Sequence, residues 1–397
     1  MAVNIQYKAK ISAKWILDKD EYNIETDSIS SVLIEHDYDN NNLPLIYLIV
    51  NLKSSIYNQM VNNSENKKSK IYLEIKNYNM NEDNPIGIVD IKNQFTYFMP
   101  KNQNYEQDII DEASKNNNDE SAYIRVAIGL MNQSMLDKNR KNFEDKIFDG
   151  INKPTLVYRA LKHYKKLCIN NISATKLPVT IMPPMSTVSE YLEYVDDLYD
   201  IYKYGYRFFN DFDCTYLLNE RDIYVPNGSG DYSTVLINID GVGSPEGSTP
   251  GLVIDKDAKM YKLECNADDS NFNKDKKLSN NSSNVVGVDY KGNKVDISVG
   301  SSEENEKTHY IRTGSTEAKL KFGLLKYNTV IFVNKSLANG RYFTPNKIYM
   351  VKNYKDNKEY DGRYVLFKKS VSYQLQDGDF VPTVSLGLRM MVDFKNL

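Results

Sequence analysis

Three histidines are the residues of this sequence best suited to bind a metal or move a proton. His36, His163 and His309 lie far apart, and none belongs to an H-E-x-x-H or H-x-H pattern. A metal site would therefore need side chains from distant parts of the chain, whereas an isolated histidine is usually solvated or hydrogen-bonded. We predict no histidine metal site and expect His163 to lie on the polar side of a helix, in solvent.

Carboxylates gather at two places in the sequence. The first group, Glu193, Asp196, Asp197 and Asp200, would share the outer face of a helix over 188–204. From there they could bind calcium or act as general acids and bases. The same spacing is typical of a solvated helix face opposite an apolar stripe, and we favour that interpretation.

The second group is Asp211 and Asp213, at a turn between two expected strands. Short carboxylates at turns commonly accept hydrogen bonds from backbone N–H groups. The paired carboxylates of a glycosidase more often come from separated strands or loops. The sequence therefore indicates a turn here rather than a catalytic pair.

Motifs for nucleophilic catalysis and phosphate binding are missing from the sequence. No G-x-S-x-G or G-x-x-x-x-G-K-[ST] run occurs, and Gly241-Val242-Gly243 lacks a third glycine and a following helix. The three cysteines, Cys168, Cys214 and Cys265, form no C-x-x-C pair, which disfavours a disulfide framework and favours a reducing compartment. We predict no catalytic residue, no cofactor-binding residue and no metal ligand, and hence no enzyme.

The charge balance disfavours tight binding to nucleic acid. Fifty Lys and Arg against 53 Asp and Glu leave a net charge of −3, with no concentrated basic region. Lys67, Lys68 and Lys70 lie in a polar loop, where lysines usually serve solubility. No signal-type segment and no apolar run of about 18 residues occurs, so we expect a chain made in the cytoplasm and not inserted in a membrane.

The first 150 residues show short β-type runs between polar loops, as in an antiparallel barrel or sandwich with few helices. Ile71, Leu73 and Ile75 would share one face of a strand. Residues 45–50 are apolar throughout, which suits a strand buried on both faces.

A helical period begins after residue 150. Pro154 starts one amphipathic helix, and Thr187 with Glu190 forms a capping box for a second helix that we expect to end at Gly205. Strands at 206–209 and 215–218 should follow, which completes a small α/β domain.

The remainder of the chain returns to a β pattern. Residues 226–312 are rich in Gly, Ser and Asn, which predicts extended loops on a thin β scaffold around a strand at 234–239. From 313 on, hairpin turns are expected at Asn339-Gly340, Asp361-Gly362 and Asp377-Gly378.

Four stretches of the sequence together resemble one family. They are DSISSVLIEHDYDNNNLPLIYLIVNL, KNFEDKIFDGINKPTLVYRALKHYKK, PPMSTVSEYLEYVDDLYDIYKYGYRFFNDFDCTYLLN and NGRYFTPNKIYMVKNYKDNKEYDGRYVLFKKSVSYQLQDGDFVPTVSLGLRMM. By order and number they resemble the baseplate hub proteins of contractile-tailed bacteriophages, whose relatives include the hub half of type VI secretion spike proteins. None of the four is a catalytic signature.

The resemblance implies an α+β, mainly β chain in which two tube-type antiparallel β-barrel domains, 1–150 and 313–397, flank a small α/β middle domain, 151–312. It implies a homotrimer that connects the hexameric tail tube to the central spike, contacts other baseplate proteins and continues the tail lumen for DNA. The protein would then reside in the tail baseplate of the virion.

Two other functions stay open at this point. A host-binding or distal tail protein would use the tyrosine-rich surface and the 226–312 loops for contacts. A tail-associated cell-wall hydrolase would depend on the carboxylates described above.

Overall fold

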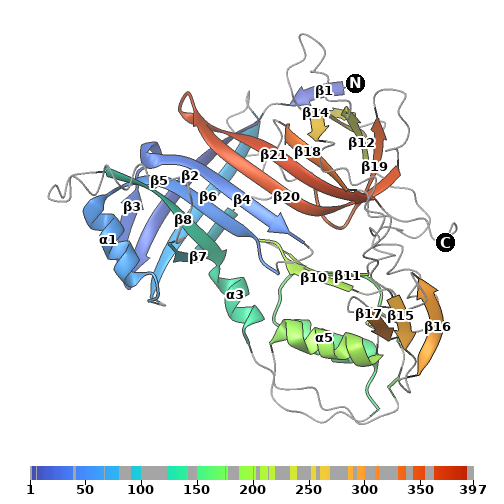
Figure 1. The fold of residues 1–397 in the computed structure, drawn as a ribbon. Coiled ribbons are helices and arrows are strands. Elements are labelled where there is room, and N and C mark those ends of the chain that lie inside the picture. The colour runs from blue at the N-terminus through green and yellow to red at the C-terminus, as the bar shows by residue number, and fades with distance from the viewer. Residues whose placement is uncertain are drawn as a thin grey trace.

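The computed structural model describes residues 2–5, 7–38, 42–66, 68–79, 91–99, 123–141, 150–174, 176–177, 187–199, 201–202, 206–212, 214–219, 233–238, 252–255, 260–268, 285–288, 293–299, 309–312, 330–336, 343–353 and 362–390. Within these residues the protein is mainly β, with one large sheet, two small sheets and a few helices (Figure 1).

Eight strands of the large sheet pair in a closed, antiparallel ring. In spatial order they are β2 (Tyr7–Leu17), β6 (Ser69–Asn79), β7 (Ile91–Phe98), β8 (Tyr123–Asn132), β5 (Leu45–Lys53), β4 (Ile29–Asp37), β20 (Gly362–Gln376) and β21 (Asp379–Met390). The ring closes where Ala9 of β2 pairs with Phe380 of β21. The short strand β3 (Asp20–Ile24) pairs with β2 alone, and a 3-10 helix, η1 (Thr26–Ser28), follows it.

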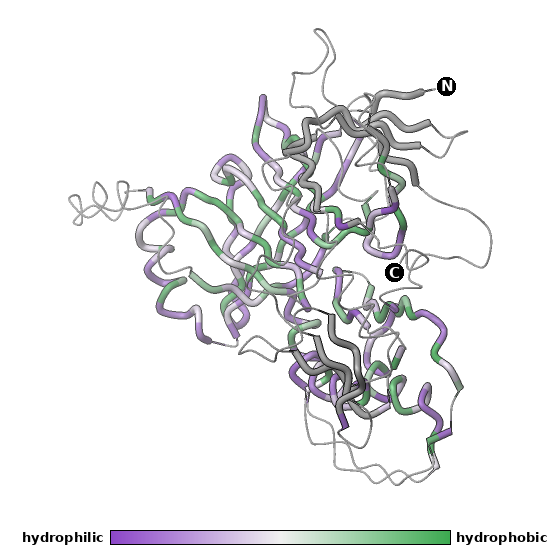
Figure 2. Tube along the Cα trace, turned by 45° about the vertical axis from the view of Figure 1, so that its right-hand side comes forward, coloured by the Kyte–Doolittle hydropathy of each residue, from purple (hydrophilic) through white to green (hydrophobic). Residues whose placement is uncertain are grey.

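Alternate side chains along these strands point into the ring and form its core, and Figure 2 shows the alternation of hydrophobic and hydrophilic residues. Ile71, Leu73 and Ile75 are all buried, which confirms their predicted common face. The prediction for 45–50 is wrong, because Ile46, Leu48 and Val50 are buried whereas the residues between them are only half-buried. The helix α1 (Ser54–Asn63) follows β5 and packs against the core of the ring, where its Met60 is fully buried.

A second closed ring shares β20 and β21 with the first. Its other strands are β19 (Ile348–Asn353), β12 (Ser233–Asn238), β14 (Met260–Asp268) and β18 (Val330–Ser336). Here β12 runs parallel to β14 and β19, and the other pairs are antiparallel. The strands β13 (Leu252–Asp255) and β1 (Ala2–Ile5) extend this part of the sheet from β14.

The long β20–β21 hairpin spans both rings, so strand pairing crosses the predicted boundary at 313. Strands of 15 and 12 residues extend about 50 and 40 Å at about 3.3 Å per residue, which is long enough to line two rings in succession. The predicted turn at its tip is confirmed, with positive φ at both Asp377 (50°) and Gly378 (89°). Asn339, Gly340 and Asp361 of the other two expected turns lie outside the described residues.

The predicted loop-rich region contributes more strands than expected. The strand at 234–239 is confirmed as β12, and β13 and β14 pair into the large sheet. A separate small sheet has the order β16 (Lys294–Val299), β15 (Val285–Val288), β17 (His309–Arg312).

Below the large sheet in Figure 1 lies a small α/β unit. It contains α4 (Lys153–Leu161), α5 (Val188–Tyr199) and a sheet of β10 (Tyr206–Asn210), β11 (Thr215–Asn219) and β9 (Leu167–Ile169). The helix α3 (Gln133–Asn139) continues from β8. The described part of the first 150 residues therefore contains two α-helices, where few helix signals were seen.

Both predicted helices of this unit form. The capping box of α5 is confirmed, since the Thr187 N–H donates to Glu190 Oε2 at 2.8 Å. The helix ends at Tyr199 rather than near Gly205. Just beyond it, the Ile201 N–H donates to the Asp196 carboxylate at 2.8 Å and so does not continue the helical hydrogen bonds.

Candidate functional site at the junction of the two cores

The β10–β11 hairpin lies between two hydrophobic cores. Phe209, Tyr216 and Leu218 belong to the core of the large sheet, whereas Phe208 and Leu217 belong to the core formed with α4 and α5. Short strands buried on both faces leave little exposed side-chain surface, so this hairpin joins the small unit to the large sheet through packing.

A bulge in β20 receives two hydrogen bonds at this junction. The register of β20 with β21 shifts between Leu366 and Lys368, which leaves Phe367 as the extra residue. The Leu366 carbonyl accepts from the Arg207 guanidinium at 3.3 Å, and the Phe367 carbonyl accepts from the Tyr38 N–H at 2.9 Å. Both carbonyls at the bulge thus accept a hydrogen bond, one from Arg207 of β10 and one from Tyr38, directly after β4.

Gly387 lies opposite the bulge on β21, where there is little room for a side chain. A Cβ on Gly387 would lie 3.0 Å from the Phe367 ring and 3.0 Å from the Lys368 Cβ. The bulge, Gly387 and Arg207 therefore form one closely packed joint at the place where the hairpin passes from the first ring to the second.

Three ionisable side chains meet beside this joint. Asp211 Oδ1 lies 4.0 Å from His36 Nδ1 and accepts the Phe212 N–H at 2.8 Å. The Lys369 Nζ donates to the Phe343 carbonyl at 3.1 Å. His36 and Lys369 are only 6% and 7% exposed, although Lys and His are usually found at surfaces.

The surroundings of these groups shift their pKa values in physically distinct ways. Burial, and then the charge of Lys369, lower the pKa of His36 to about 3 against the opposing effect of Asp211, so the imidazole is neutral. Burial acts to raise the pKa of Asp211. The interaction with His36, the charge of Lys369 and the hydrogen bond from the Phe212 N–H outweigh it and hold that pKa below its usual value. Burial lowers the pKa of Lys369, opposed by Asp211.

The junction is completed by backbone contacts around Asn42. Its carbonyl accepts from the Asn210 N–H at 2.9 Å and from the Asn210 side chain at 3.2 Å. Its side-chain amide donates to Ser189 Oγ, in the first turn of α5, at 2.6 Å. Together, the hydrogen bonds of Asn42, Arg207 and Asp211 fix the β10–β11 turn against β4 and β20. Their role is structural.

The other candidates from the sequence do not join this site. Glu193 is exposed on α5, and Asp196 accepts the hydrogen bond that ends that helix. His163 follows α4 and is half-buried, and its pKa is lowered by burial and then by Lys141, Lys162 and Lys138. Asp200 and Asp213, and the side chains of Asp197, His309 and Cys265, lie outside the described part of the chain.

Two cysteines that are distant in sequence come onto neighbouring strands. Cys168 of β9 pairs with Tyr216, and Cys214 immediately precedes β11. Burial raises the pKa of both thiols, that of Cys214 to about 11, so both are protonated near neutral pH.

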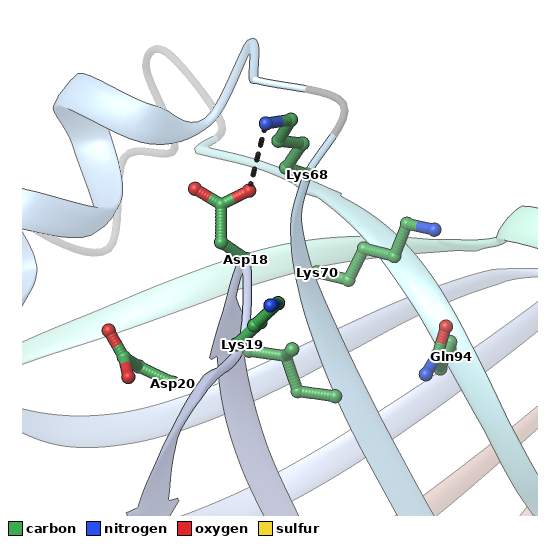
Figure 3. Close-up of a pocket in the computed structure, with 7 residues that line it drawn as sticks. Asp18, Lys19, Asp20, Lys68, Lys70 and Gln94 are labelled. Carbon is green, nitrogen blue, oxygen red and sulfur yellow. Dashed lines mark ion pairs between the residues drawn. The ribbon is translucent and has the colours of Figure 1, made fainter.

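Lys68 and Lys70 line an open hollow at the β2–β3 turn, together with Asp18, Lys19 and Asp20 (Figure 3). The Lys68 Nζ lies 3.2 Å from Asp18 Oδ1. Lys67 lies outside the described residues.

The described residues contain no metal-site candidate, because no three of their His, Cys, Asp or Glu side chains lie close enough together to bind one metal ion. None of the described helices has the length and apolarity needed to cross a bilayer.

Sequence reasoning weighed Asp211 and His36 separately and missed Arg207 and Lys369. These four side chains come from three strands and a turn that are far apart in the chain, and no local spacing signals their convergence. The sequence did contain one signal for this junction, the run Tyr206-Arg207-Phe208-Phe209. Successive large apolar residues on a short strand indicate that both of its faces are buried, and hence that it lies between two cores.

No protein-family model matches this sequence, and no characterised protein matches it by sequence. By structure, the chain superposes on the tail protein from Neisseria meningitidis MC58 with a TM-score of 0.50 over 96% of both chains, at 8% identity. The chain has the fold of a tail protein. The resemblance to phage tail proteins is thereby confirmed at the level of fold.

More distant likenesses to this tail-protein fold also span nearly the whole chain. A 43 kDa tail protein of prophage MuSo2 from Shewanella oneidensis gives a TM-score of 0.48 at 10% identity, covering 95% of this chain and 96% of that one. The c3393 protein of Escherichia coli, a type VI secretion component with structural similarity to the T4 bacteriophage tail proteins gp27 and gp5, gives 0.44 at 9% identity, covering 98% and 78%.

Proposed function

We propose that this chain is a structural baseplate hub protein of a phage tail. It forms a trimeric ring that connects the hexameric tail tube to the central spike and continues the tail lumen for DNA passage. The tail-protein fold supports a structural role in a tail, and the ring geometry within the chain supports the hub role in particular.

The observation that carries the proposal is the presence of two closed strand rings in one chain. Three chains bring six such rings around an axis, which matches a hexameric tube on one side and a threefold spike on the other. A closed cyclic assembly of this kind uses a heterologous contact between the first ring of one chain and the second ring of the next.

The interior of the first ring supports placing the lumen between chains. Trp15, Phe95 and Tyr97 are at most 1% exposed inside it, and a small barrel filled with side chains leaves no channel. DNA would therefore pass through an opening that several copies surround, and self-association becomes part of the function.

In this proposal the domains keep the order expected from the sequence, with two changes. Residues 1–150 form a first tube-type barrel domain and 313–397 a second barrel domain, whose hairpin also closes the first. Residues 151–312 form a middle domain that also supplies β12 and β14 to the second ring. The protein is made in the host cytoplasm and resides in the virion, in the tail baseplate. Its partners are the tail tube protein, the central spike and other baseplate proteins, with neither tight nucleic-acid binding nor membrane insertion.

The alternatives differ from this role in measurable ways. A host-binding or distal tail protein would bind host cells in isolation. A hydrolase would clear peptidoglycan in a zymogram, but the described carboxylates do not support it, since Asp211 is packed at the junction and Glu193 is exposed on α5.

The test is the oligomeric state, measured alone and in the particle. We expect light scattering on the purified chain, with and without its spike partner, to give a trimer. A reconstruction of the tail should show six barrels around the lumen. A strict monomer in the assembled particle, or a single barrel per chain, would refute the hub role.

A further inference from the structure

A cluster of ionisable side chains closes the junction between the large sheet and the small α/β unit. Two of its members, His36 of β4 and Lys369 of β20, lie directly opposite each other on paired strands. The third is Asp211, in the β10–β11 turn. Cross-strand partners of an antiparallel pair have Cβ atoms about 4.5–5.5 Å apart, so the strand register alone makes the imidazole and the ammonium neighbours.

The small α/β unit is held at this junction without strand pairing to the large sheet. Among the described residues, β9, β10 and β11 form a sheet of their own, and β10 and β11 lie between the large sheet and α5 (Figure 1). Single hydrogen bonds cross the junction, such as that from the Asn210 N–H to the Asn42 carbonyl at 2.9 Å. The unit also has a hydrophobic core of its own. Its separation from the sheet therefore breaks fewer contacts than global unfolding does, which is the condition for a separate local opening.

His36 is the member of the cluster whose charge changes most readily near neutral pH, because a free histidine titrates near pH 6.5. Its side chain is buried between the rings of Tyr38 and Phe212. The 4.0 Å from its Nδ1 to Asp211 Oδ1 is too long for a direct hydrogen bond. The closed junction thus gives a charged imidazole aromatic neighbours and a carboxylate that does not bond to it directly.

The charges that act on His36 come from two elements packed against it. Burial, and then the charge of Lys369 on β20, lower the pKa of His36 to about 3, against the opposing effect of Asp211 in the turn. The other titratable or charged groups of the junction lie around Tyr38 and are Arg207, Tyr216 and Tyr349. A protonated His36 would thus share the Asp211 carboxylate with Lys369, so two cations would face one anion in a buried site.

From this arrangement we propose that His36, Lys369 and Asp211 form an acid-sensitive latch, which holds the small α/β unit on the large sheet at neutral pH and opens when His36 is protonated. An imidazolium directly opposite a buried ammonium repels it, and opening lets both cations reach water. The element that moves is the β10–β11 hairpin, because it brings Asp211 and Phe212 against His36. The latch lies within one chain and does not depend on the number of copies in the proposed ring.

Proton linkage gives the direction and size of the effect. The pKa of His36 is 6.5 in the open state, where the imidazole is in water, and about 3 in the closed state. The closed state is therefore fully favoured above pH 6.5 and loses this advantage as the pH falls toward 3. At pH 4.5, two pH units below 6.5, the opening equilibrium is about a hundredfold larger than at pH 7.5. Asp211 contributes little at pH 4.5, which lies above the ordinary carboxyl pKa of 3.8.

Hydrogen exchange at single-residue resolution on the full chain, at pH 7.5 and 4.5, measures this opening. The reporter is the Asn210 amide, whose bond to the Asn42 carbonyl crosses the junction. Protection factors remove the pH dependence of the chemical exchange step, and we expect that of Asn210 to fall about a hundredfold in acid. Global unfolding also exposes His36, so amides of β6 in the same sample are the reference. Asn210 should be less protected than β6 by about tenfold or more at both pH values.

Three variants assign the response to the latch. His36→Gln stays neutral at every pH, so the protection of Asn210 should then differ by less than about twofold between pH 7.5 and 4.5. Lys369→Met removes the opposing charge, so the closed state accepts a proton earlier and the fall between pH 4.5 and 3.5 should become shallower. The matched control is His163→Gln, at a half-buried histidine outside the junction, which should keep the hundredfold fall.

Three results would overturn the latch. Equal protection of Asn210 at pH 7.5 and 4.5 would show that the junction does not respond to acid. Equal protection of Asn210 and the β6 amides at pH 4.5 would mean global unfolding in place of a local opening. A hundredfold fall that persists without the histidine would assign the response to another group. His36→Phe, which matches the flanking rings, repeats this last measurement in case His36→Gln does not fold.

Discussion

At His36 the folded chain keeps an imidazole between the rings of Tyr38 and Phe212, at centroid distances of 5.4 and 5.8 Å. The neighbouring charges are Lys369, which disfavours protonation, and Asp211, which favours it. A histidine held neutral by burial makes the folded state sensitive to acid. Between the pKa values of the folded and unfolded states, the histidine is protonated in the unfolded chain but stays neutral in the folded chain.

This gives a pH prediction for the junction. The pKa of His36 falls from 6.5 when unfolded to about 3 when folded, so the folded state binds fewer protons between these values. Its contribution to stability is complete above pH 6.5 and is lost as the pH falls toward 3, by at most about 1.4 kcal/mol per pH unit. Urea unfolding between pH 7.5 and 4.5 should show a shallower pH dependence for His36→Gln than for the unmodified chain.

A second histidine variant serves as the control for that measurement. His163→Gln should change the pH dependence less, because His163 is only half-buried and lies outside the junction. Equal slopes for His36→Gln and the unmodified chain would show that water or a proton reaches the imidazole in the folded state.

At the scale of elements, the α5 helix shows which sequence signals are sufficient. Its capping box and apolar spacing depend on neighbours within four residues, and both are formed as predicted. Its end was misplaced, because the Asp196 carboxylate competes for the Ile201 N–H. Local side chain to backbone bonds of this kind are difficult to foresee from periodicity.

The burial of α5 gives a matched pair of substitutions on adjacent residues. Leu192 is fully buried in the small core, whereas Glu193 is exposed. Leu192→Ala should lower the free energy of unfolding by about 2–5 kcal/mol, whereas Glu193→Ala should change it by less than about 0.5 kcal/mol. Thermal or urea unfolding followed by circular dichroism measures both, and similar losses would mean that the wrong face of α5 had been identified as core.

For the whole molecule, the shared β20–β21 hairpin has a thermodynamic consequence. Residues 368–374 of β20 pair with β4 in the first ring, and 362–365 pair with β19 in the second. The core residues of both rings also belong to one continuous cluster. Two rings with a common hairpin and a common core should unfold together rather than as separate domains.

That cooperativity is tested by a substitution in one ring and a measurement in the other. Leu388 is fully buried and pairs with Ile331 in the second ring. Leu388→Ala, at a cost of about 2–5 kcal/mol, should lower hydrogen-exchange protection in β6 of the first ring as well as in β19. Protection that falls in β19 while β6 stays unchanged would show two independently stable barrels.

The sequence by itself determined what depends on near neighbours. Alternation predicted the shared face of Ile71, Leu73 and Ile75, the capping box predicted the start of α5, and Asp377-Gly378 predicted the hairpin tip, since each pattern acts within a few residues. The order of the four quoted stretches predicted a tail-protein fold.

Tertiary structure alone decided which distant segments meet. The sequence gives no sign that one hairpin serves two rings, because strand partners are chosen by the packing of the whole sheet. The same holds for His36 and Asp211 at the junction and for Lys138 beside Lys165. Tyr164, in turn, joins the segment after α4 to the end of α3 through Asn139 and Lys138, which lie more than 20 residues earlier in the chain, beyond the reach of any local pattern.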